Sequence, residues 1–92
     1  MFMFLRNATV QWWSTGVMKG PIFCETREVA KKVLPLFRPS RRGIVIAEIG
    51  AVENAVETME SQIEAQRKIG ANCYFIVKNV GEKNVTTEIV PL

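Results

Sequence analysis

The segment 43–80 constrains the fold of this chain more than any other part of it. It reads as a strand over 43–49, a helix over 51–68 and a second strand over 73–77. The outer pieces are short apolar runs rich in β-branched and aromatic residues, which is typical of buried strands. The middle piece repeats apolar side chains at helical spacing, at Val52, Val56, Met59 and Ile63. Two strands around one amphipathic helix predict a βαβ unit with a right-handed crossover.

Residues 2–13, at the start of the chain, allow two readings. Alternating apolar residues favour a strand, and Asn7 is a residue type that turns a chain, so both one long strand and a tight hairpin fit. Trp12 and Trp13 are adjacent, so on a strand their side chains must point to opposite faces. We expect one of them in the core.

Local signals place the remaining elements. Residues 14–21 should form a loop, because two glycines and a proline interrupt them. Thr26 can cap a helix that runs to about Leu34, where the following proline ends it. Gly70 is the expected left-handed residue after the second helix. Residues 80–85 should form a hairpin loop before a last strand over 85–90.

Together these elements predict an α+β fold in β(β)αβαββ order. The chain of 92 residues is the size of one domain, so we expect a single domain over 1–92. The predicted architecture is a two-layer sandwich, a four- or five-stranded mixed sheet with two helices on one face. Its edge strands need covering, and dimerisation would cover them. A homodimer is therefore one expectation.

The residue types that are missing restrict the chemistry. The sequence has no histidine and no aspartate, and all nine acidic residues are glutamates. Acid–base catalysis near neutral pH most often uses histidine, and zinc or iron sites combine histidine, cysteine and carboxylates. We therefore expect no enzyme, no metal site and no cofactor.

Charge is distributed unevenly along the chain. The net charge is +3, but residues 1–47 carry eight basic and two acidic residues, and residues 48–92 carry four basic and seven acidic ones. Arginine and lysine suit phosphate groups. The sequence thus predicts a nucleic-acid-binding surface on the first helix and the connector after it, using Lys19, Arg27, Lys31, Arg38, Arg41 and Arg42. An ordinary solvated surface is the plainer interpretation of the same charges.

The second helix offers a different function. Its glutamates at 53, 57, 60 and 64 share one face beside the apolar one. A solvated helix face explains them simply. The sharper alternative is a protein-interaction, inhibitor or regulatory module that acts as a homodimer through this acidic helix and exposed aromatic residues.

Cysteine usage and hydropathy set expectations for the compartment. The sequence has two cysteines, Cys24 and Cys73, without metal-type spacing. They read as buried thiols in a reducing compartment, or as one disulfide in an exported protein. No apolar run approaches the ~20 residues of a membrane-spanning helix, and the apolar start lacks the pattern of a signal peptide. The expectation is a cytoplasmic protein with no membrane partner.

Two family resemblances involve mainly the second half of the chain. Residues 44–46, 50–52 and 55–60 resemble the strand-to-second-helix segment of the Alba chromatin proteins, whose βαβαββ order also occurs in the C-terminal domain of translation initiation factor three. This resemblance implies a nucleic-acid-binding dimer with a loop lysine, here Lys19, and a hairpin arm, here at 81–84. In competition, residues 68–76 and 85–89 are similar to small enterobacterial stress-induced domains of the periplasm.

Overall fold

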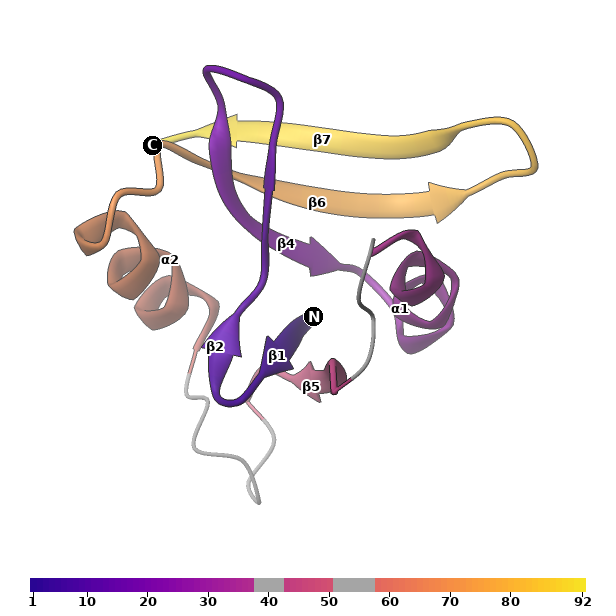
Figure 1. The fold of residues 1–92 in the computed structure, drawn as a ribbon, viewed down its shortest axis with the longest axis horizontal. Coiled ribbons are helices and arrows are strands. Elements are labelled where there is room, and N and C mark those ends of the chain that lie inside the picture. The colour runs from indigo at the N-terminus through magenta and orange to yellow at the C-terminus, as the bar shows by residue number, and fades with distance from the viewer. Residues whose placement is uncertain (38–42, 51–57) are drawn as a thin grey trace.

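The computed structural model describes residues 1–37, 43–50 and 58–92 (Figure 1). Residues 51–57 of the predicted helix over 51–68 therefore lie outside the described residues, as do Arg38, Arg41 and Arg42. Thr58 is extended, so the helix that the structure describes starts at Met59, later than predicted. The elements follow in the order β1 (Phe2–Arg6), β2 (Thr9–Val10), β3 (Trp12–Ser14), β4 (Lys19–Cys24), α1 (Arg27–Val33), the 3-10 helix η1 (Leu34–Leu36), β5 (Val45–Glu48), α2 (Met59–Lys68), β6 (Cys73–Val80) and β7 (Val85–Pro91).

All the described strands belong to one mixed sheet. The strand order is β2-β1-β4-β6-β7, and β3 pairs with β4 while β5 pairs with β1. Only β4 and β6 pair in parallel, and the other pairs are antiparallel. The predicted α+β class and mixed sheet are thus confirmed. The sheet has seven strands instead of four or five, because the first 24 residues contribute four of them.

The N-terminal segment is a hairpin followed by a further strand, which settles the ambiguity of the sequence. Asn7 and Ala8 both have positive φ, at 50° and 64°, and turn the chain so that Leu5 pairs with Val10. Two positive φ angles in a two-residue turn are the geometry that matches the natural twist of a hairpin. The chain then reaches β4, where Trp13 pairs with Gly20.

β4 was not predicted, although it is the most buried strand. Five of its six residues are buried, including Gly20 and Pro21, which the sequence assigns to a loop. Gly20 is in extended backbone, packed so closely on β6 that a Cβ atom there would lie 1.7 Å from the carbonyl oxygen of Cys73. The glycine therefore marks a close approach of two strands and not a turn.

The predicted βαβ unit exists in a wider form. β5 and β6 run in the same direction, since β5 is antiparallel to β1, β1 is antiparallel to β4, and β4 is parallel to β6. Two strands, β1 and β4, lie between them. The prediction that β5 and β6 form one local βαβ unit is wrong in this respect, because β1 and β4 occupy the centre of the sheet.

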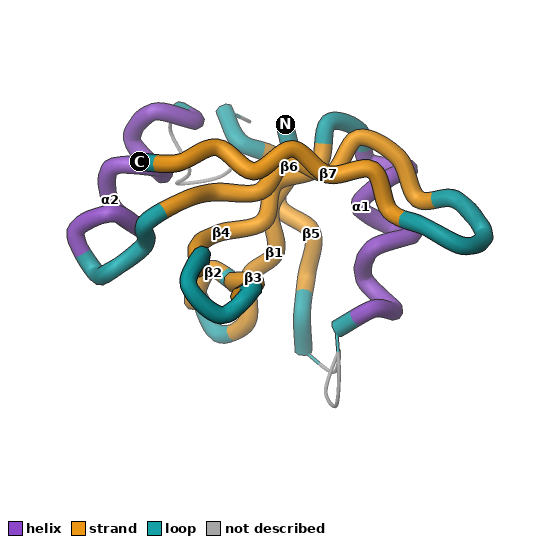
Figure 2. Tube along the Cα trace, turned by 90° about the horizontal axis from the view of Figure 1, so that it is seen from above, coloured by secondary structure: helices purple, strands orange, loops and turns teal. Residues whose placement is uncertain are grey.

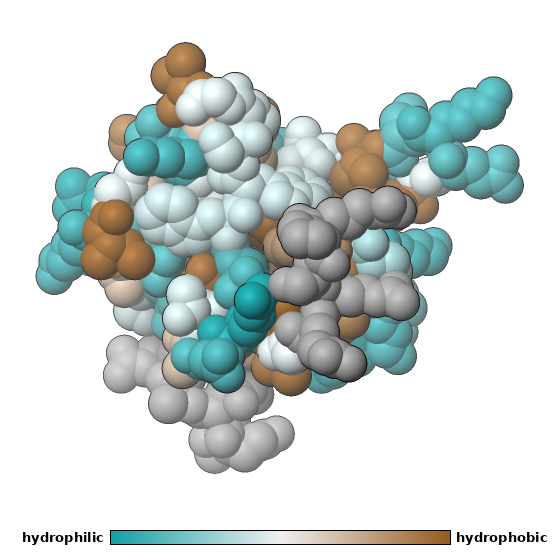
Figure 3. Space-filling view, viewed as in Figure 1, coloured by the Kyte–Doolittle hydropathy of each residue, from teal (hydrophilic) through white to brown (hydrophobic). Residues whose placement is uncertain are grey.

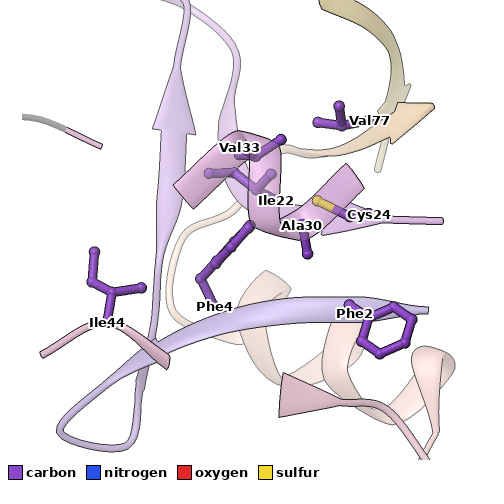
Figure 4. Close-up of a cluster of buried hydrophobic side chains, with 8 residues drawn as sticks. All are labelled: Phe2, Phe4, Ile22, Cys24, Ala30, Val33, Ile44 and Val77. Atoms are coloured by element: carbon purple, nitrogen blue, oxygen red, sulfur yellow. The ribbon is translucent and has the colours of Figure 1, made fainter. Parts of the chain in front are cut away.

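The two helices lie on opposite faces of the sheet, which corrects the predicted two-layer arrangement (Figures 1 and 2). Phe2 and Phe4 of β1 point to the face that α1 covers with Ala30 and Val33 (Figure 4). Met3, between them in β1, points to the other face, where Met59 and Ile63 of α2 pack. β1 is apolar on both sides, so each face requires a cover.

Side-chain caps define the helix ends. Thr26 Oγ1 accepts a hydrogen bond from the Val29 N–H at 3.1 Å, as predicted. At α2, Thr58 and Ser61 cap each other reciprocally, with Oγ1 and Oγ as the acceptors. Gly70 follows α2 with φ of 114°, which confirms the left-handed residue. None of the described helices is both long and apolar enough to cross a membrane.

Candidate nucleic-acid interface

α1 brings three of the chain's cationic side chains to the surface. Arg27, Lys31 and Lys32 are all exposed, while Ala30 and Val33 of the same helix are buried against the sheet. Arg27 and Lys31 are four residues apart, so they lie on one side of the helix. α1 thus turns its apolar side chains to the sheet and its cations to the surface.

Arg27 is held by two neighbours without being buried. Its Nη2 lies 3.8 Å from Glu48 Oε2, and its Cζ lies 5.0 Å from the centroid of the Phe2 ring. The side chain remains 48% exposed. An ion pair this long and this exposed contributes about 0–1 kcal/mol, so the contacts orient the guanidinium group and leave it accessible to an anion.

The two lysines have fewer constraints. Within the described part of the chain, neither Lys31 nor Lys32 forms an ion pair, although Glu28 stands four residues before Lys32 on the helix. Their amino groups are therefore available for a ligand. A flexible lysine binds a phosphate as a point charge.

Lys19 is not brought together with these residues. It is the first residue of β4, and α1 follows the last one, so the length of the strand, about 17 Å, separates them. Its main chain is tied to Asn72, whose Oδ1 accepts from the Lys19 N–H at 2.8 Å. The positions of Arg38, Arg41 and Arg42 are outside the described residues.

Lys83 was not predicted as a site residue. It lies in the loop between β6 and β7 and is exposed. Because β4 and β6 are parallel neighbours, the end of β4 that leads into α1 and the end of β6 that leads into this loop lie at the same end of the sheet (Figures 1 and 2). Sequence spacing alone does not reveal such an adjacency; a correct strand pairing would have revealed it.

The acidic side chains of α2 lie across the sheet from α1. Glu60 is exposed, and Glu64 accepts two hydrogen bonds from Arg67, at 3.0 and 2.8 Å. The bonded Arg67 guanidinium lowers the pKa of Glu64, and Glu64 in turn raises the pKa of Arg67. One carboxylate of the predicted acidic stripe is thus partly neutralised. Glu53 and Glu57 are outside the described residues.

The tryptophans pack to opposite sides, as their adjacency predicts. Trp12 Nε1 donates a 2.7 Å hydrogen bond to Oε1 of the buried Gln66 in α2. Trp13 packs on the α1 side, edge-on to Phe75 with ring centroids 6.0 Å apart. The exposed large hydrophobic residues that the structure describes are all aliphatic or methionine, so the prediction of exposed aromatic residues is wrong. On the face of the molecule that is turned to the viewer in Figure 1, Figure 3 shows apolar residues in small separate groups.

A shallow hollow of about 460 Å³ lies between α2 and the N-terminal hairpin. Gln66 and Ile69 form its helical side. The side chains that line it carry no charge: Ala8, Thr9, Val10, Gln11, Trp12, Gln66 and Ile69. Such a surface suits a neutral segment and offers nothing to a phosphate.

The cysteines are free and buried. β4 places Cys24 opposite Val77, four residues along β6 from Cys73, which is about 13 Å and too far for a disulfide. Burial raises the pKa of the Cys24 thiol to about 12 and also raises the pKa of Cys73. Both thiols are therefore protonated at neutral pH. Over the described residues, no group of three or more metal-binding side chains comes together.

The exposed cations of α1, with Lys83 in the hairpin loop at the same end of the sheet, have the chemistry that suits an anion. It offers a polyanion an exposed helix on one face of the sheet, with the acidic helix on the other. Comparison with protein-family models, with curated proteins and with solved structures found no match for this chain.

Proposed function

We infer that the protein is a small non-enzymatic nucleic-acid-binding module that uses α1 and the basic segment after it. The observation that carries this proposal is the placement of α1 and α2 on opposite faces of the sheet. A polyanion that approaches α1 meets Arg27, Lys31 and Lys32, and the sheet separates it from Glu60 and Glu64. The acidic helix therefore does not oppose binding at α1 strongly.

The expected contacts are to phosphates. Arg27 and Lys31 come from α1, Arg38, Arg41 and Arg42 follow within the next eleven residues of Lys31, and Lys83 stands at the same end of the sheet. The aromatic residues that the structure describes are buried or half-buried, so α1 has no fully exposed ring on which bases would stack. Phosphate contacts position a nucleic acid without reading its bases. The proposal therefore includes little sequence preference and a steep dependence on salt.

Fluorescence anisotropy with labelled single-stranded DNA, duplex DNA and RNA tests this function. Each oligonucleotide is titrated at low ionic strength and again at increasing salt. Lys31→Glu should weaken binding about tenfold at low salt and reduce the slope of log K against log salt by about 1. Lys19→Glu changes the net charge equally from the far end of β4 and is the matched control.

The two variants show whether nucleic-acid affinity depends on the position of the charge on α1 or on the net charge of the protein. The proposal predicts that Lys19→Glu retains most of the affinity. An equal loss in both variants would mean that only the net charge matters. An absence of salt-sensitive binding to all three nucleic acids would exclude the function itself.

A protein-interaction module is the second candidate, and the uncharged hollow beside α2 favours it. This surface would take a neutral, partly apolar peptide segment. Selection of peptides from a random library on the unmodified protein tests it, with the variant Ile69→Glu as the control protein that should not bind the selected peptides. Ile69 is 70% exposed, so this variant should fold. Peptides that bind both proteins equally would remove the hollow as the site.

A further inference from the structure

β7 is an open edge of the sheet. In the described part of the chain its strand partner is β6 alone, and its outer side faces no other strand. It is seven residues long, and Glu88 is its one charged residue. Natural edge strands that avoid pairing with another chain are usually short, bulged or rich in charged residues. β7 is neither short nor rich in charge, and the irregularity in this hairpin falls on β6, between Val77 and Asn79. Proline, another feature of protected edges, occurs in β7 only at its last residue, Pro91.

The side chains of β7 point alternately to the two faces. Ile89 pairs with Phe75 and Thr87 pairs with Val77, so both lie on the α1 side of the sheet, and Val85 follows the same alternation. Ile89 is 44% exposed and Val85 is 37% exposed, although both are aliphatic. Each lacks a neighbour on the outer side of the strand.

Symmetry limits how a second copy can pair with this edge. Two copies of one strand that pair antiparallel are related by a twofold axis perpendicular to the sheet, so the axis passes beside one residue. With the axis at Glu88, the two Glu88 carboxylates would face each other, which is destabilising. With the axis at Thr87, Ile89 meets Val85 of the second copy in two equivalent places, and Glu88 meets Thr86.

We propose that β7 forms the interface of a homodimer in which two copies pair antiparallel about Thr87. This pairing covers the exposed aliphatic side chains, gives Thr87 a threonine partner and leaves the Lys78–Glu88 ion pair of 3.4 Å within each copy. It extends the sheet through the dimer. The two α1 helices, with their cationic side chains, then lie toward opposite ends of the assembly, because the paired strands run in opposite directions. The inference stands independently of nucleic-acid binding.

Cysteine substitution tests both the interface and its register. Thr87→Cys places two thiols directly across the axis, and mild oxidation should convert the protein into a species of twice 10.4 kDa on a non-reducing gel. Glu88→Cys is the matched control, because each of its thiols would face Thr86 of the other copy, which leaves the two thiols two residues apart along the strands. Predominant cross-linking of Glu88→Cys would overturn the register. A 10.4 kDa mass for the unmodified protein by light scattering at all accessible concentrations would overturn the dimer.

A charge pair supplies a second test that does not depend on disulfide geometry. Ile89→Lys alone and Val85→Glu alone should each be monomeric, since each places charges against an aliphatic partner. A mixture of the two should restore a heterodimer, because the new lysine then faces the new glutamate. Circular dichroism of both variants shows whether each is folded. Folded variants that stay dimeric alone, or that fail to associate when mixed, would contradict the pairing.

Discussion

Replacement of Gly20 by alanine probes the closest approach in the sheet. The added Cβ would lie 1.7 Å from the Cys73 carbonyl oxygen and 2.8 Å from its carbon, and real Cβ atoms stay at least 3.0 Å away. β4 and β6 must therefore move apart by at least 1.3 Å at this point, the difference between 3.0 and 1.7 Å. The atoms in the way belong to the backbone, so no rotamer change relieves the overlap.

The expected loss of stability combines two contributions. Overpacking of a tight core costs about 1–3 kcal/mol. The separation also breaks the two hydrogen bonds that join Lys19 to Asn72, of 3.0 and 2.8 Å, at about 1 kcal/mol each. The free energy of unfolding should fall by about 3–5 kcal/mol, out of the roughly 5–14 kcal/mol typical of a domain of this size.

Urea denaturation followed by tryptophan fluorescence measures this loss, since Trp13 pairs with Gly20. Gly16→Ala is the control, because Gly16 has φ of 84° and open space around it. That variant should lose only the strain of a left-handed alanine, about 1–2 kcal/mol. If Gly20→Ala were no less stable than Gly16→Ala, the close packing of β4 on β6 would be refuted.

Three further predictions follow from local geometry. Ala8→Gly should raise the free energy of unfolding by about 0.5–1 kcal/mol, because glycine removes the strain of φ at 64°; a loss of stability in urea denaturation would contradict the turn. Asn72→Ala should cost about 1–2 kcal/mol, since its side chain donates to the Val17 carbonyl and accepts from the Lys19 N–H, at 2.7 and 2.8 Å; an unchanged thermal midpoint would exclude these bonds. Because burial raises the pKa of Cys24 to about 12, the unfolded chain loses the thiol proton first, so stability should fall above about pH 9 by up to ~1.4 kcal/mol per pH unit. The same urea titrations on Cys24→Ala should give a shallower decline, and identical slopes would show that Cys24 does not titrate differently in the two states.

The helices show how local signals determine local structure. Thr26 caps α1 and Gly70 follows α2 as predicted, because each depends on a few neighbouring residues. The hairpin loop predicted over 80–85 is confirmed for the same reason, with 81–84 between the two strands. The cap formed by Thr58 and Ser61 was missed, since serine replaces the glutamate that usually signals a capping box.

The centre of the sheet depended on contacts between residues far apart in sequence. β4 was missed because Gly20 and Pro21 usually break strands, and here a close approach to Cys73 requires the glycine. The position of β1 and β4 between β5 and β6 likewise cannot be predicted from hydrophobic periodicity. The fold class was predictable, but the number of strands and their order were not.

For the candidate site, the sequence located the cations, and the tertiary structure decided which of them are neighbours. α1 presents Arg27 and Lys31 together, while Lys19 lies at the far end of β4 and Lys83 joins the α1 end. The spacing of residues within α1 is enough to predict which of its charged side chains are exposed. Their grouping follows from strand pairing, because hydrogen bonds between strands connect segments that the chain itself keeps far apart.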